Sequence, residues 1–117
     1  MTAWLRARPQ LAAHQYVQQR AVRARCALAS MEALLFSVRR AWLAGDDCEA
    51  ELSTLKMEGA ERALAAAEDQ VRLFGARGYE TSTGAEKDLR DLVGLTMLGG
   101  TAELHQSVVF RALRGGA

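Results

Sequence analysis

The sequence predicts an all-α fold, an up-down four-helix bundle in which two long helices precede two short ones. Residues of high helix propensity, above all alanine, leucine, arginine and glutamate, dominate the composition, and the single proline is Pro9. Apolar residues recur at steps of three and four, and no segment alternates with the period of a strand. A chain of 117 residues has room for one domain, whose ordered core we expect over about residues 10–113.

The first long helix is expected over residues 11–44. Its apolar side chains recur at alternating steps of four and three and form a packing seam: Val17, Ala21, Ala24, Leu28, Met31, Leu35, Val38 and Trp42. Gly45 suits the left-handed residue after a helix, and Asp46 or Asp47 suits the next N-cap. The chain is therefore expected to reverse direction in a tight turn.

The second long helix is expected over residues 48–74. One apolar stripe runs along it at steps of three and four: Met57, Ala60, Leu64, Ala67, Val71 and Phe74. Small residues beside the stripe would let a neighbouring helix approach closely. Two long helices joined by a tight turn make an antiparallel hairpin.

A glycine-rich loop over residues 75–84 separates the long helices from the short ones. Thr83 and Glu86 have the spacing of a capping box for a third helix over about 85–98. This helix would pack its apolar face on the hairpin.

The fourth helix is expected over about 102–113. Gly99 and Gly100 stop the preceding helix, and the Thr101 hydroxyl suits an N-cap. We expect the tail at 115–117 to fray.

Composition and charge exclude several classes of protein. A net charge of +1 argues against a nucleic-acid-binding protein. Cys26 and Cys48 lack metal-ligand spacing, so we predict neither a zinc site nor a disulfide scaffold. No apolar stretch is long enough to cross a bilayer, and no secretory signal is recognisable. The cytoplasm is the expected compartment.

Short motifs in the second half of the chain resemble the C-terminal domain of acyl-CoA dehydrogenases. Residues 53–79 are similar to the family segment that ends in a glutamine, two apolar residues and a glycine-rich turn. Arg90 and Asp91 resemble the family's Arg-Asp pair, and Gly100-Thr101 follows at the spacing of its Glu-Gly-Thr motif. The similarity covers about residues 10–113.

The resemblance implies a helical domain that packs on two other domains around FAD and an acyl-CoA thioester. In the family, a glutamate removes a proton next to the thioester carbonyl while a hydride leaves for the flavin. The matching position here is Gly99, which has no side chain to act as the base. Some family members carry this glutamate on the first long helix, where Glu32 is the only acid.

The family's flavin-contacting positions are also altered. Its glutamine corresponds to Arg72, and its second glycine to Ala76, which Arg77 follows. Both arginines could receive a phosphate or carboxylate of a CoA, a phosphopantetheine or a flavin, or could simply be solvated. Thr101 keeps its match and could contact a flavin, although helix capping explains the same hydroxyl. The isolated chain is expected to bind FAD poorly or not at all.

Three residues are candidates for catalysis. Besides Glu32, His105 could act as an acid or base near neutral pH, although a solvated histidine is the ordinary outcome at a helix end or polar face. Asp91 could line a pocket, although the family resemblance implies that Arg90 and Asp91 form a structural pair. No metal site is predicted.

Two functions from different classes follow. The first is a non-catalytic or partial subunit that completes an acyl-thioester and flavin site, by homo-oligomerisation or with a larger acyl-CoA dehydrogenase-like chain. The second is a cofactor-independent cyclase or isomerase of specialised metabolism that holds a polyketide-like or acyl molecule in the apolar bundle. A structural module without a ligand is a third possibility. Whether the chain is an enzyme stays open at this stage.

Overall fold

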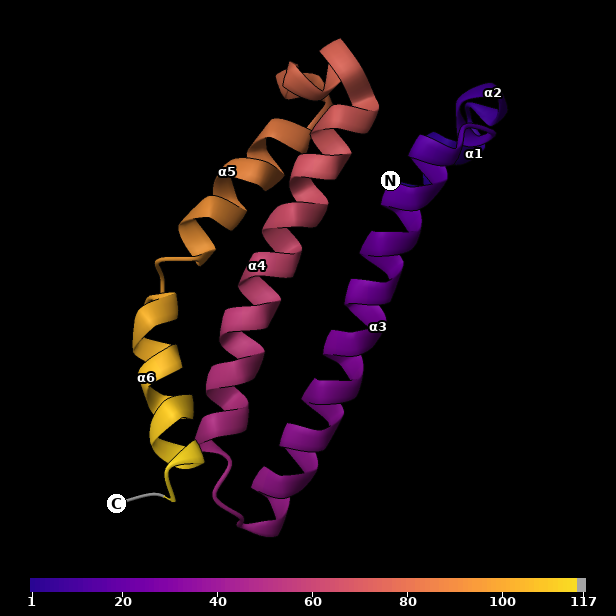
Figure 1. Cartoon of the computed structure of the whole chain (residues 1–117). Coiled ribbons are helices and arrows are strands. Elements are labelled where there is room, and N and C mark those ends of the chain that lie inside the picture. The colour runs from indigo at the N-terminus through magenta and orange to yellow at the C-terminus, as the bar shows by residue number, and fades with distance from the viewer. Residues whose placement is uncertain (116–117) are drawn as a thin grey trace.

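The computed structural model describes residues 1–115 and consists of helices joined by short turns (Figure 1). The predicted all-α fold is confirmed. The helices are α1 (Thr2–Arg6), α2 (Pro9–Ala12), α3 (Gln15–Ala44), α4 (Glu49–Phe74), α5 (Ala85–Leu95) and α6 (Ala102–Leu113), with two 3-10 turns, η1 (Gly75–Tyr79) and η2 (Thr81–Thr83), before α5. Within this described part no helix is long and apolar enough to cross a membrane.

The four main helices form three rows, with α4 in the middle (Figure 1). The long helix α3 packs along one side of α4, and α5 and α6 follow one another along its other side. In residues 1–115, α3 contacts neither α5 nor α6. The result is an elongated body of 55 × 23 × 23 Å with a radius of gyration of 17.2 Å. A compact chain of this length would have a radius of gyration of about 13 Å.

The turn between the long helices forms as predicted, except that Cys48, and neither Asp46 nor Asp47, stands at the N-cap of α4. Gly45 ends α3 in the left-handed conformation, with φ 81°. The Asp47 carboxylate then accepts a hydrogen bond from the Glu49 backbone N–H at 3.1 Å, which satisfies one free donor at the start of α4. Local sequence alone determines this reversal.

The start of the first long helix differs from the prediction. Pro9 begins the separate short helix α2, and the extended backbone of His14 interrupts the helical path, so that α3 starts at Gln15. We predicted that the tail at 115–117 frays. Two of these residues, Gly116 and Ala117, lie outside the described residues.

Both predicted side-chain caps of the short helices need correction. The Thr83 hydroxyl accepts a hydrogen bond from the Ala85 N–H at 3.3 Å, but Glu86 pairs with Arg90 instead of closing the capping box. Thr101 stands at the N-cap of α6 without a side-chain hydrogen bond to the helix backbone.

The core is thin. Its buried apolar residues are Val17, Val38, Cys48, Ala60, Ala67, Leu73 and Ala85, and within the described chain no large side chain is fully buried. Trp42, expected in the packing seam, is 64% exposed, because α3 has a neighbour on one side only. So much exposed apolar surface is typical of a chain that packs on another molecule.

Candidate functional site

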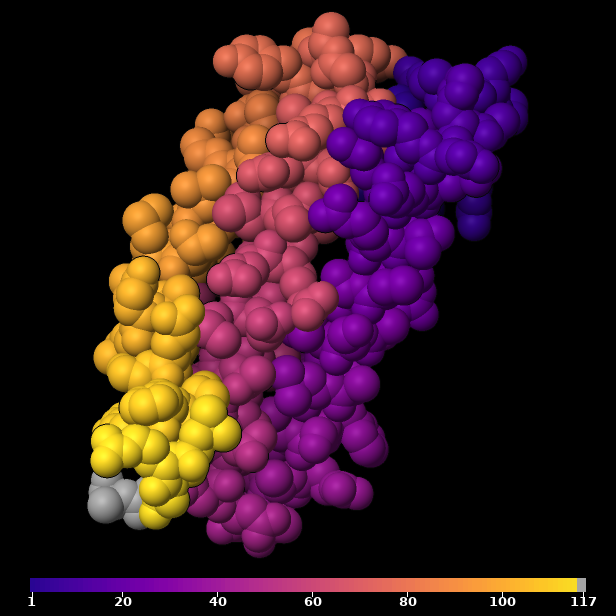
Figure 2. Space-filling view, viewed as in Figure 1, coloured from indigo at the N-terminus to yellow at the C-terminus, as the bar shows by residue number. Residues whose placement is uncertain are grey.

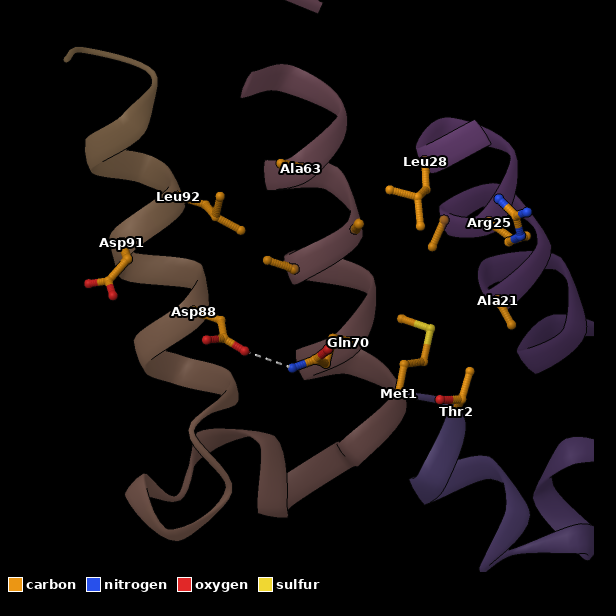
Figure 3. Close-up of a pocket in the computed structure, with 13 residues that line it drawn as sticks. Met1, Thr2, Ala21, Arg25, Leu28, Ala63, Gln70, Asp88, Asp91 and Leu92 are labelled. Carbon is orange, nitrogen blue, oxygen red and sulfur yellow. Dashed lines mark hydrogen bonds between the residues drawn. The ribbon is translucent and has the colours of Figure 1, made fainter. Parts of the chain in front are cut away.

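An apolar groove of about 620 Å³ lies along α4, between α3 and α5 (Figure 3). Its floor consists of small side chains of α4, including Ala63 and Ala66, while Leu28 of α3 and Leu92 of α5 face one another across it. The groove exists because α3 and α5 both pack on α4 without touching each other. It is open to solvent except where Met1 and Thr2 lie beside it, unlike an enclosed ligand cavity.

Polar side chains stand at the rims of this groove. The Gln70 amide donates a hydrogen bond to the Asp88 carboxylate at 3.2 Å (Figure 3). On the same α5 rim, Asp91 forms an ion pair with Lys87 one turn away. On the α3 rim stands Arg25. The groove is therefore apolar at the floor, acidic on one side and basic on the other.

Asp91 is the one candidate catalytic residue among the three that lines this groove. Its carboxylate is exposed, and the hydrogen bond from Lys87 holds the pKa of Asp91 below its ordinary value. The same contact raises the pKa of Lys87. Because a general base needs a pKa near the working pH, these shifts point away from proton abstraction by Asp91.

The predicted Arg90–Asp91 pair does not form. Arg90 contacts Glu86 at 3.2 Å, and Asp91 contacts Lys87, so both ion pairs lie within α5 at spacing i, i+4. Consecutive residues on a helix point in directions about 100° apart, so neither side chain of the pair meets the other. These contacts stabilise the helix surface and do not tie α5 to its neighbours.

Glu32 and His105 lie on other helices. Glu32 projects from α3 with a 63% exposed side chain and a loose 3.9 Å contact to Arg25. His105, in the first turn of α6, has its Nε2 3.2 Å from the Gly99 carbonyl oxygen, so Nε2 carries the proton and donates. This bond closes the turn before α6. The structure thus does not assemble the three candidates into one site.

The position that matches the family's glutamate is occupied by a left-handed glycine. Gly99 has φ 74°, and a Cβ there would lie 3.5 Å from the Cε of Lys56. The Lys56 ammonium donates a hydrogen bond to the Leu95 carbonyl at 2.7 Å. The surroundings of Gly99 are therefore cationic, with no carboxylate taking the place of the missing base among these contacts.

The candidate cofactor residues do not form one common binding site. Arg72 is 59% exposed and pairs with Glu68 at 3.6 Å, and Arg77 is exposed in η1. Thr101 lies at the far end of α5, before α6. A hydrogen bond from the Thr101 hydroxyl, added to the larger effect of a backbone N–H, lowers the pKa of Glu103. These residues do not fit a complete flavin site.

A buried ionic cluster between α3 and α4 was not predicted from the sequence. The Asp69 carboxylate, 8% exposed, lies 3.1 Å from the Arg20 Nε and 3.9 Å from the Arg23 guanidinium. The Arg20 guanidinium stacks 4.0 Å from the ring centroid of Tyr16. A spacing of three between Arg20 and Arg23 places both on one helix face, but only the packing of α3 on α4 brings Asp69 to them.

Residues 1–114 match the family model described as acyl-CoA dehydrogenase, C-terminal domain. The chain belongs to this family. Over 101 residues it is 34% identical to the L-prolyl-[peptidyl-carrier protein] dehydrogenase of Pseudomonas fluorescens, strain Pf-5. That match covers 86% of this chain and 27% of the relative, so the chain spans about a quarter of the length of the curated relative.

Two solved structures share the fold. The FAD complex of PigA superposes with a TM-score of 0.83, and PigA with FAD and proline with a TM-score of 0.84. Each is 21% identical, and the similarity covers 86% of this chain and 26% of the other chain. The fold expected from the resemblance is thereby confirmed.

Proposed function

We propose that the chain is the helical part of an acyl-CoA dehydrogenase-like enzyme, without catalytic activity of its own. It completes an acyl-thioester and flavin site together with a larger flavin-bearing chain, or by assembling with further copies of itself. The proposed substrate class is an aminoacyl thioester on a carrier protein, as the name of the curated relative suggests. The cytoplasm stays the expected compartment.

One observation carries this proposal. The position that matches the family's base is Gly99, whose added Cβ would lie beside the Lys56 side chain. The remaining carboxylate candidates, Glu32 and Asp91, are exposed, ion-paired and on separate helices. The described residues thus offer one wall of a site without a carboxylate placed as its base, which supports a non-catalytic role.

The thin core supports the requirement for a partner. Side chains such as Phe36, Trp42 and Phe110 are more than half exposed on the isolated chain. Burying apolar surface of this kind contributes about 25 cal/mol per Å², which favours assembly with a second molecule.

The alternative, a cofactor-independent cyclase or isomerase, is supported by the groove itself. An apolar floor with Gln70, Asp88 and Asp91 at its edge has the composition of a small-molecule site. Its open form and the exposed, paired state of Asp91 make it the weaker candidate.

The test begins with the flavin content of the purified chain, released by heat and quantified by absorption. We expect a colourless chain. We also expect a flavin-bearing polypeptide to copurify with it from the native source, in a complex that oxidises a prolyl-carrier thioester. About one flavin per isolated chain, or a stable homo-oligomer without flavoprotein or thioester oxidation, would contradict the proposal.

A further inference from the structure

A second cavity lies between α3 and α4 and does not reach α5. Its volume is about 260 Å³, and its lining comes entirely from these two helices, which lie side by side in the space-filling view (Figure 2). Its polar side chains are Arg23, Cys26 and Ser30 of α3 and Arg62 and Asp69 of α4. The rest of its lining is alanine.

The arginines around Asp69 outnumber its single negative charge. Arg20 lies 3.1 Å from the carboxylate and stacks on Tyr16, so it already supplies the counter-charge. The Arg23 guanidinium lies 3.9 Å from the same carboxylate, with its side chain 59% exposed, and in residues 1–115 no other acid is within ion-pair distance of it. These three residues together carry one surplus positive charge, which Arg23 presents at the cavity.

Arg62 stands on the α4 wall of the cavity in a fixed orientation. Its Nε and one terminal nitrogen both donate to the Glu58 carboxylate, at 3.0 and 2.8 Å. Glu58 therefore neutralises the charge of Arg62, but a guanidinium has further N–H donors that these two bonds do not use. Arg62 can add a hydrogen bond to an anion held by Arg23 without adding net charge.

The charge balance of the cavity favours a monoanion. One negative charge would balance Arg23, whereas a second would be repelled by Asp69, whose side chain is only 8% exposed in the cavity wall. A carboxylate also accepts two parallel hydrogen bonds from a guanidinium. The helix α3 adds positive potential along its length, because it carries five arginines and a single acid, Glu32.

The polar cavity continues into an apolar one between the same helices. This second space has a volume of about 290 Å³ and lies on the side of the tight turn. Both cavities share Ala24, Ala27, Arg62 and Ala66 as lining residues. The side chains at this part of the α3–α4 contact are too small to fill the space between the helices. A ligand with its charged head at Arg23 can place an apolar tail there.

We infer that these joined cavities bind an amphipathic monocarboxylate, an alkyl carboxylate of medium length. The Arg23 guanidinium binds the carboxylate, Arg62 adds a hydrogen bond, and the tail lies among the alanines of α3 and α4. The inference goes beyond the proposed function and does not depend on it, since binding requires neither flavin nor thioester.

Octanoate is the probe, with butyrate as the control for the tail and octylammonium as the control for the head. NMR chemical-shift titration of the full chain measures the three affinities. Each buried methylene contributes about fourfold in affinity, so octanoate should bind at least about tenfold more tightly than butyrate. Octylammonium would place a cation beside Arg23 and should bind at least about tenfold more weakly than octanoate.

Two substitutions locate the head and the tail. Arg23→Gln removes the surplus charge and should weaken octanoate binding about tenfold or more, while Arg40→Gln, exposed on the same helix outside both cavities, should leave the affinity within about twofold. Ala27→Leu fills the space for the tail and should also weaken binding about tenfold. Ala29→Leu, exposed outside both cavities, is its matched control, and circular dichroism checks that all variants fold.

Cys26 provides an independent readout of the same site. It is exposed and lines the polar cavity, while the other cysteine, Cys48, is buried. Saturating octanoate should slow alkylation of Cys26 by iodoacetamide at least about threefold, and this protection should be lost in Arg23→Gln. Mass spectrometry of the alkylated chain measures the rate.

Several outcomes would overturn the inference. They are the absence of octanoate binding to the folded chain, equal affinities for octanoate and octylammonium, and an octanoate affinity that neither Arg23→Gln nor Ala27→Leu changes. The last would place the ligand elsewhere, such as in the groove beside α5. None of these measurements involves a flavin-bearing partner, so the inference and the proposed function can fail separately.

Discussion

The Asp69 carboxylate of α4 lies 3.1 Å from the Arg20 Nε of α3, in a site where both side chains are largely buried. The Arg20 N–H is not directed at the carboxylate oxygen, so the contact is an ion pair without a well-formed hydrogen bond. It joins the two long helices near the end remote from the tight turn, where the covalent connection constrains them least.

Removing the carboxylate should destabilise this end of the hairpin. Asp69→Asn leaves the Arg20 guanidinium buried without a counter-charge, and we expect a loss of about 3 kcal/mol in the free energy of unfolding. Urea denaturation followed by circular dichroism measures it. The paired variant Arg20→Met with Asp69→Leu removes both charges and should stay within about 1 kcal/mol of the natural chain. A neutral effect of Asp69→Asn would show that the pair contributes nothing to stability.

Gly45, directly after α3, and Gly59, inside α4, differ in backbone conformation, so replacing each with alanine should have opposite effects on stability. Gly45 has φ 81°, so Gly45→Ala should cost about 1 kcal/mol. Gly59 is inside α4, and a Cβ there would meet the Met31 sulfur at an ordinary 3.9 Å, so Gly59→Ala should stabilise by about 0.5–1 kcal/mol. Thermal unfolding measures the change in stability of both variants. A change in the same direction for both would contradict the left-handed conformation of Gly45 or the helical conformation of Gly59.

Gly78 has a steric requirement of a different kind. A Cβ at this buried position would overlap the Val71 carbonyl oxygen, so Gly78→Ala must displace η1 from the end of α4. We expect a loss of at least about 2 kcal/mol, the range of severe local strain. Gly94→Ala, with open space around its added Cβ, is the matched control and should be neutral or slightly stabilising. Urea denaturation measures both, and equal effects would refute the close approach.

Glu103 should titrate below the ordinary range of a glutamate. Its pKa is lowered first by a backbone N–H and then by the Thr101 hydroxyl. A folded-state pKa below the unfolded value adds stability above the unfolded pKa, and this is lost as the pH falls through the folded pKa. Thr101→Val should move the pKa partly back toward 4.5, with the backbone effect retained. NMR titration of the Glu103 carboxyl carbon measures the shift; an unchanged pKa in Thr101→Val would contradict the hydroxyl's role.

The helices were predictable because their signals are local. The second long helix was expected over 48–74 and is observed at Glu49–Phe74, between a left-handed glycine and the glycines of the following loop. Three signals determine the helix and its ends: the conformation of glycine, the period of apolar side chains and a nearby aspartate. Each of them depends only on residues a few positions apart. The first helix was predicted too long because the extended backbone at His14 is a break without a glycine.

The candidate site was harder to predict. Asp91 lines the groove, but its ion-pair partner is Lys87 rather than Arg90, and a catalytic role for Asp91 stays a prediction. Asp69 looked like one of several acids that balance the basic first quarter of the chain, because nothing local distinguishes a buried carboxylate from a solvated one. Its burial depends on an arginine about fifty positions away.

The sequence by itself determined the helical class, the order and approximate bounds of the main helices, and the family resemblance, because short-range periodicity and residue type encode all three. Only the tertiary structure decided which faces meet. It placed α5 and α6 in one row, left Trp42 exposed, buried Asp69 and opened the groove between α3 and α5. An apolar stripe shows that a helix face avoids water, but the neighbour that covers the face is set by contacts between distant segments, including those supplied by another molecule.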